Sequence, residues 1–139
     1  MVMKEFKYGI DHLTPEIALS LANDNIKGVI SSQAKERINK SFNAVQNISK
    51  GDKPIYSVNT GFGSLCTTII SKEDTGKLQE NLLKSHSVGV GNPVNPLIVK
   101  LMLILKVHAL CKGFSGVSLG LIERISRLFR VCGPQQIDP

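Results

Sequence analysis

One short segment, YSVNTGFG from Tyr56 to Gly63, combines residue types that favour chemistry on a small ligand. Gly61 and Gly63 flank Phe62, and glycine lets a backbone turn with positive φ and approach a ligand closely. Tyr56 adds a phenol, which acts as a general base only where positive charge or hydrogen-bond donors stabilise its ionised form. The alternative interpretation is a surface turn with an incidental tyrosine. Both interpretations remain open from this segment alone.

The polar pair before the glycines, Asn59 and Thr60, is suited to hold such a loop in place. Short polar side chains of these types form hydrogen bonds with nearby backbone groups in turns. A histidine, His86, follows where helical sequence gives way to glycine and proline. At the end of a helix it is either a cap that interacts with the helix dipole or a contact for substrate. His108, in an apolar segment, is interpreted as a satisfied core residue.

Composition indicates a globular helical protein rather than a nucleic-acid binder. The 139 residues are 42% hydrophobic and 20% charged, which suits one domain with a core. Only 5% are aromatic and there is no tryptophan, which favours helices over a β-sandwich. The net charge is +6, yet no basic run is longer than two and no aromatic residues are interleaved with the basic ones. We therefore expect no nucleic-acid partner.

Cysteine spacing and hydropathy favour a cytoplasmic protein without a metal site or a membrane span. Cys66, Cys111 and Cys132 lie far apart, with no CxxC spacing, which predicts neither a zinc site nor a disulfide framework. Free thiols fit a reducing cytoplasm. Lys100 and Lys106 interrupt the most apolar region. A bilayer-spanning helix needs about 20 mostly apolar residues, so we expect no membrane association.

Start and stop signals predict a mainly α, multihelical fold with little or no β-structure. Thr14, Ser31 or Ser32, and Ser71 are N-cap residue types at the start of apolar-periodic segments. Glycine and proline make the segment around Tyr56 a loop, with room for a brief extended piece at 55–58. The expected helices lie within residues 13–24, 31–49, 71–86, 96–112 and 118–130.

The segment 96–112 is apolar nearly all round, which predicts a buried helix. The other expected helices are short and would cover it only in part. Large exposed apolar patches usually mark interfaces. We therefore expect this helix to meet more protein, either from a longer chain or from another subunit in a homo-oligomer.

Three segments in this order, YSVNTGFG, LQENLLKSHSVGVGNP and LMLILKVHALCKGFSG, resemble the N-terminal part of the histidine ammonia-lyase family, within the aromatic amino acid lyases. The resemblance runs from Tyr8 to about Phe129. It implies an N-terminal helical portion of the all-α lyase fold at residues 1–130, followed by an irregular tail at 131–139 in place of the cofactor-forming segment. The most specific matches are Tyr56, Asn59, Thr60, Gly61, Gly63, Leu78, Gln79, Ser85, His86, Gly89, Gly91 and Pro93.

The resemblance implies a reaction and roles for the residues above. Family enzymes eliminate ammonia from an aromatic amino acid, and histidine gives trans-urocanate. Their electrophile is a methylidene-imidazolone (MIO) ring, formed from an internal Ala-Ser-Gly, and the full-length enzymes are homotetramers. Tyr56 matches the general base at the β-carbon of the substrate, and His86 matches a histidine near the substrate side chain. The loop Gly61–Gly63, with Phe62, would pass close to substrate and ring.

The sequence departs from the family in one respect that bears on activity. No Ala-Ser-Gly occurs anywhere in the 139 residues. Because a base alone cannot expel a poor amine leaving group, we expect these residues to be inactive on their own. A fragment of a tyrosine or phenylalanine ammonia-lyase remains an alternative, because tyrosine-specific members also carry a histidine at the position of His86. A non-catalytic helical interaction module is the other alternative.

Overall fold

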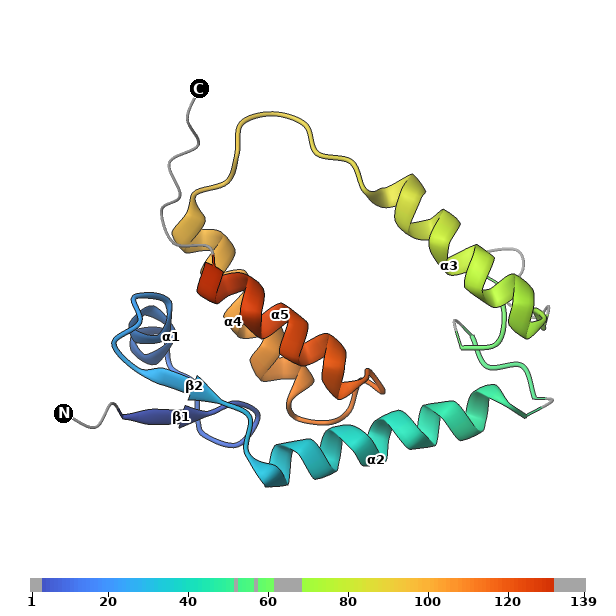
Figure 1. Cartoon of the computed structure of the whole chain (residues 1–139), viewed down its shortest axis with the longest axis horizontal. Helices are drawn as coiled ribbons and strands as arrows, with labels where there is room; N and C mark the ends of the chain where they lie inside the picture. Colours follow the sequence, from blue (N-terminus) through green and yellow to red (C-terminus); the bar gives the residue numbers. More distant parts are fainter. Residues whose placement is uncertain (1–3, 52, 57, 62–68, 132–139) are drawn as a thin grey trace. The chain divides into compact units, whose positions relative to one another are not determined.

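The computed structural model describes residues 4–51, 53–56, 58–61 and 69–131 (Figure 1). It forms two compact units, one made of residues 1–43 and 93–139 and the other of residues 44–92. The predicted tail at 131–139 lies outside the described residues except for Val131, which ends the last helix. The elements are β1 (Glu5–Lys7), α1 (Pro15–Ala22), β2 (Lys27–Val29), α2 (Ser32–Ser49), α3 (Lys72–His86), α4 (Pro96–Leu110) and α5 (Leu119–Val131).

The helices begin where the capping residues predict. Thr14, Ser31 and Ser71 each accept a hydrogen bond from the backbone N–H three residues later, at 3.1 to 3.3 Å. These bonds satisfy N–H groups that have no partner within the helix. Asn95 does the same for α4, accepting from the N–H of Leu97 at 2.9 Å. The mainly α prediction is confirmed, and the β-structure in the described residues is one short parallel pair, β1 and β2, plus an isolated bridge.

The core of the first unit forms where the short sheet meets the helices. Tyr8, which follows β1, is 1% exposed, and its ring lies edge-on to the rings of Phe6 and Phe129. Gly28 of β2 leaves the space that this ring needs, since a Cβ there would lie 2.3 Å from the Tyr8 hydroxyl oxygen. The core residues are Phe6, Tyr8, Leu21, Ala22, Ile38, Ile104, Val107, Leu110, Cys111, Ile122 and Phe129.

Helix α4 is buried on one side only, as expected from the short helices that were predicted to cover it only in part. Ile104 and Val107 are 0% exposed, and α1 and α5 pack against this side (Figure 1). The opposite side is apolar but open, because the two packing helices reach only one face. Its exposed apolar residues are Ile98, Met102 and Leu105, between 50% and 62% exposed.

The turn between α4 and α5 is docked on α2 through its two glycines. Gly113 has φ +79° and lies so close to Arg37 that a Cβ would be 2.7 Å from the Arg37 Cβ. Gly116, with φ +64°, donates its N–H to the Ser41 hydroxyl at 2.9 Å. Both glycines follow the end of α4 at Leu110.

Replacing Gly113 with alanine should lower the free energy of unfolding by about 2 kcal/mol, because the new Cβ meets Arg37 and the backbone is left-handed. Urea-induced unfolding followed by circular dichroism measures this. Gly120→Ala is the matched control, because Gly120 lies in α5 with no heavy atom within 4 Å of the added Cβ. Alanine should stabilise that helix by up to about 1 kcal/mol. Equal losses for both variants would contradict the docking of Gly113 on α2.

Adjacent residues of α4 should respond very differently to truncation. Ile104→Ala removes a side chain that is 0% exposed and should cost about 2–5 kcal/mol of unfolding free energy. Leu105→Ala, at a position 54% exposed, should cost less than about 1 kcal/mol. Thermal and urea unfolding of the two variants check the prediction. A large loss at Leu105 would show that the open side of α4 is covered in solution.

Candidate active site

The predicted site residues that the structure describes all lie in the second unit, residues 44–92. Asn59, Thr60 and Gly61 are buried, whereas Tyr56 and His86 are exposed. Phe62 and Gly63 lie outside the described residues.

Asn59 fixes the backbone of the loop that carries Tyr56. Its Oδ1 accepts the N–H of Ile55 at 2.8 Å. Its Nδ2 donates to the carbonyl oxygens of Gly51 at 3.1 Å and Lys53 at 3.0 Å. One side chain that is 6% exposed therefore binds three backbone positions. This confirms the prediction that the polar pair holds the loop by side-chain to backbone hydrogen bonds.

Asn59 and Thr60 are paired with Ile70 and Ile69, respectively. Thr60 forms an antiparallel bridge with Ile69, and the N–H of Ile70 donates to the Asn59 carbonyl at 3.0 Å. The Thr60 hydroxyl, on a residue 4% exposed, donates to the Gly61 carbonyl at 3.2 Å. This closure was not predicted, because the β-branched run TTII at 67–70 favours extended backbone but does not indicate a pairing partner. The chain therefore returns to Asn59 and Thr60 just before α3 begins.

Tyr56 lies on a turn rather than on the extended piece allowed for at 55–58. The N–H groups of Val58 and Asn59 both donate to the carbonyl of Ile55, at 3.0 and 3.2 Å. A strand at this position would need the N–H of Ile55 for pairing. The Asn59 side chain accepts a hydrogen bond from that N–H instead. Tyr56 is 60% exposed, and the hydrogen bonds of Ile55 and Asn59 fix the backbone before and after it.

His86 is the last residue of α3 and caps its own helix. Its Nδ1 lies 2.9 Å from the carbonyl oxygen of Leu82 and 3.0 Å from the hydroxyl of Ser85. A carbonyl oxygen only accepts, so Nδ1 carries the proton in this bond, and the neutral ring then leaves Nε2 as an acceptor. The structure therefore confirms the capping interpretation. It also leaves Nε2 of an exposed ring for a polar group outside the chain.

The loop that follows Tyr56 meets α3 at its start, and His86 ends the same helix. Asn59 and Thr60 are bonded to Ile69 and Ile70, directly before α3. His86 is the fifteenth and last residue of α3. At 1.5 Å per residue, the two ends of α3 are about 20 Å apart.

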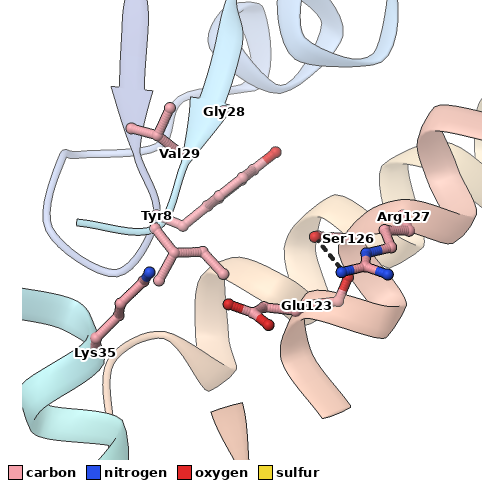
Figure 2. A pocket seen from close by; sticks show the side chains of 8 residues that line it. Tyr8, Gly28, Val29, Lys35, Glu123, Ser126 and Arg127 are labelled. Atoms are coloured by element: carbon pink, nitrogen blue, oxygen red, sulfur yellow. Dashed lines mark hydrogen bonds between the residues drawn. The ribbon is translucent and has the colours of Figure 1, made fainter. Parts of the chain in front are cut away.

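A cavity in the first unit is lined by none of the predicted site residues (Figure 2). The charged side chains of Lys35, Glu123 and Arg127 reach toward it from α2 and α5. Its remaining lining residues are Tyr8, Gly28, Val29, Ile30 and Ser126. Within the described part of the chain, no group of three or more His, Cys, Asp or Glu side chains is arranged to hold a metal ion. No helix in that part is long and apolar enough to cross a membrane.

Comparisons of sequence identify relatives of this chain. The family model for aromatic amino acid lyases matches residues 13–131. A histidine ammonia-lyase of Caldanaerobacter subterraneus subsp. tengcongensis is 42% identical over 123 residues, which is 88% of this chain and 24% of the relative. The histidine ammonia-lyase of Bacillus subtilis is 46% identical over 95 residues, or 68% of this chain and 19% of the relative. The chain therefore spans about a quarter or less of the length of these relatives.

Solved structures agree with the sequence relatives. Histidine ammonia-lyase from Trypanosoma cruzi matches with a TM-score of 0.78 and 34% identity, over 91% of this chain and 25% of that one. The ergothionase of Treponema denticola matches with a TM-score of 0.81 and 25% identity, also over 91% of this chain and 25% of that one. The helical arrangement described above is thus that of known lyases, and the chain belongs to the aromatic amino acid lyase family.

Proposed function

We propose that this chain supplies part of an active site that eliminates ammonia from L-histidine to give trans-urocanate. The observation that carries the proposal is the loop in which the Asn59 side chain binds three backbone groups that precede an exposed Tyr56. The curated relatives reported above are histidine ammonia-lyases, which favours histidine over tyrosine or phenylalanine as substrate. The residues are the base, Tyr56, and the substrate contact, His86, with the backbone of Gly61 and Gly63 close to the substrate.

In this proposal Tyr56 removes a proton from the β-carbon of the substrate. General bases work only when they are held within hydrogen-bond reach of the proton they take. Asn59 provides that restraint, because it accepts from the residue before Tyr56 and donates to two earlier carbonyls. His86 would accept a hydrogen bond at Nε2 from the imidazole of the substrate, because its Nδ1 is engaged with Leu82.

The MIO ring of the family does not fit these residues as they stand. The ring forms from Ala-Ser-Gly, and the 139 residues contain no such triad. The electrophile must therefore come from polypeptide outside these residues, and no step through it is assigned to this chain. We propose that the 139 residues are inactive on their own, and that residues 1–130 act as the N-terminal portion of a larger helical lyase.

The location of the two proposed site residues also favours a site completed by further protein. The loop after Tyr56 is bonded to the start of α3 and His86 ends that helix, about 20 Å further along its axis. We propose that each residue serves a different copy of the site, shared between subunits of a homo-oligomer. The open apolar side of α4, with Ile98, Met102 and Leu105, provides a surface for such assembly.

A non-catalytic helical module is the second candidate. The exposed apolar side of α4 favours it, because the same surface would bind a lyase subunit without any chemistry in this chain. For either role we propose a cytoplasmic location. Cys111 is a free thiol that is 0% exposed, and burial raises its pKa to about 11, so it stays protonated and unreactive in a reducing compartment.

A hybrid enzyme tests the proposed base. Residues 1–131 of this chain would replace the matching part of the Caldanaerobacter histidine ammonia-lyase, and urocanate formation would be followed by ultraviolet absorbance. Tyr56→Phe should lower kcat by about 10²–10⁴-fold, because it removes the proton acceptor. Tyr8→Phe is the matched control, since Tyr8 is the only other tyrosine in the sequence and lies in the core. Tyr8→Phe should leave kcat within a few-fold of the value for the unmodified hybrid.

The 139-residue chain assayed alone should show no urocanate above background. Robust turnover by that chain would contradict the requirement for further protein. An active hybrid with equal kcat for Tyr56→Phe and the unmodified sequence would remove Tyr56 from the mechanism. A hybrid that folds as a tetramer but lacks activity would favour the non-catalytic module.

The Asn59 side chain should be needed for an ordered loop. Asn59→Ala removes three hydrogen bonds from the segment between Gly51 and Asn59, so its backbone amides should exchange faster with deuterium. Asn59→Asp retains an acceptor for the N–H of Ile55 and should have an intermediate effect. Exchange in α4 should not change in either variant. Unchanged exchange of the loop in Asn59→Ala would show that other contacts order it.

A further inference from the structure

His108 joins the end of α4 to the N-terminal turn of the first unit. Its Nδ1 accepts a hydrogen bond from the backbone N–H of Gly9 at 3.2 Å, across 99 residues of sequence. The ring is half-buried, and its centroid lies 5.7 Å from that of Phe6 in β1. The bond therefore connects the segment after β1 to the helix at the centre of the core.

Close packing of the backbone surrounds this bond. Gly9 has φ +76°, and a Cβ at this position would lie 2.4 Å from the backbone carbonyl of Cys111. The turn thus rests directly on the end of α4, where Cys111 is 0% exposed. Small changes in the position of Gly9 are therefore transmitted to the last turn of the helix.

The bond requires one protonation state of His108. A backbone N–H only donates, so Nδ1 must be without a proton, and the neutral ring carries its proton on Nε2. The imidazolium form has a proton on both nitrogens. Its Nδ1–H would face the Gly9 N–H, so two donors would meet and the hydrogen bond would be lost.

Burial and the charged groups around the ring together lower the pKa of His108 and favour its neutral form. Burial is the main effect that lowers the pKa of His108, and the Lys112 ammonium lowers it further. Asp11 raises the pKa and His12 lowers it, both from the turn that also contains Gly9. All three groups line one cleft with His108, together with Leu105 and residues 9, 10 and 13. The ring facing this turn is therefore neutral near pH 7.

We propose that His108 is an acid-sensitive latch, in which protonation of Nδ1 breaks the hydrogen bond from Gly9 and releases the turn 9–13 from the end of α4. Because folding lowers the pKa below its ordinary value of 6.5, the opened chain binds the proton more readily than the closed one. Above about pH 6.5 the Gly9–His108 hydrogen bond contributes fully to stability. This stability is lost as the pH falls through the lower pKa that His108 has in the folded chain. The latch does not depend on the proposed lyase function.

NMR of the ¹⁵N-labelled 139-residue chain tests the latch. At pH 7 the Nδ1 shift of His108 should be that of an unprotonated nitrogen, and the Gly9 amide should be protected from exchange. Between pH 7 and pH 5, protection of Gly9 should fall by about five- to tenfold after correction for the intrinsic exchange rate, as expected for loss of one hydrogen bond. A protonated Nδ1 at pH 7 would overturn the proposal without any variant.

Two substitutions separate His108 from the other titrating groups of the cleft. His108→Gln replaces the ring by an amide whose oxygen accepts at any pH, so the acid-induced loss of Gly9 protection should disappear. His12→Gln removes the other histidine of the same cleft and should leave the acid response intact. If His108→Gln fails to fold, the ¹⁵N chemical shift of Nδ1 in wild-type His108 still tests the proposal. An equal acid response in His108→Gln and wild type, or none in wild type, would rule the latch out.

Discussion

The first unit depends on the burial of one side of α4. Ile104, Val107 and Leu110 lie at the centre of the core, and α1 and α5 pack on that side of the helix. The short parallel sheet is tied to the same helix by the hydrogen bond from Gly9 to His108. Burial of side chains as large as isoleucine stabilises a fold by about 1.5–3 kcal/mol each. Without the contacts on this side of α4, the sheet and helices α1 and α5 would have no shared surface to pack against.

Local signals in the sequence were sufficient to predict the helices and their starts. Caps at Thr14, Ser31 and Ser71 form as predicted because each involves only a residue and an N–H three positions later. The apolar helix and its incomplete coverage were both predicted correctly, but the side that is covered was not. An apolar pattern on all sides of α4 does not indicate which face other elements will cover. Among the described helices, α1 and α5 pack against one side of α4, and the opposite apolar face stays open.

The candidate site shows the same division between local and long-range information. The role of Asn59 as a loop anchor could be predicted, because its partners at Gly51, Lys53 and Ile55 are near in sequence. The pairing of Thr60 with Ile69 could not, because a single bridge leaves no clear period in the sequence. Tyr56 and His86 were assigned by resemblance to a family. No spacing rule indicates that the loop after Tyr56 meets the start of the helix that His86 ends.

The unit of residues 44–92 has a further consequence that follows from what is buried in it. Among its described residues, the buried ones are Asn59, Thr60 and Gly61, and no large apolar side chain is among them. The described residues are ordered by hydrogen bonds to the backbone, while the described hydrophobic core cluster lies in the other unit. Substitutions at these loop residues would therefore remove no side chain from that core cluster. The two units can thus vary in sequence largely independently of each other.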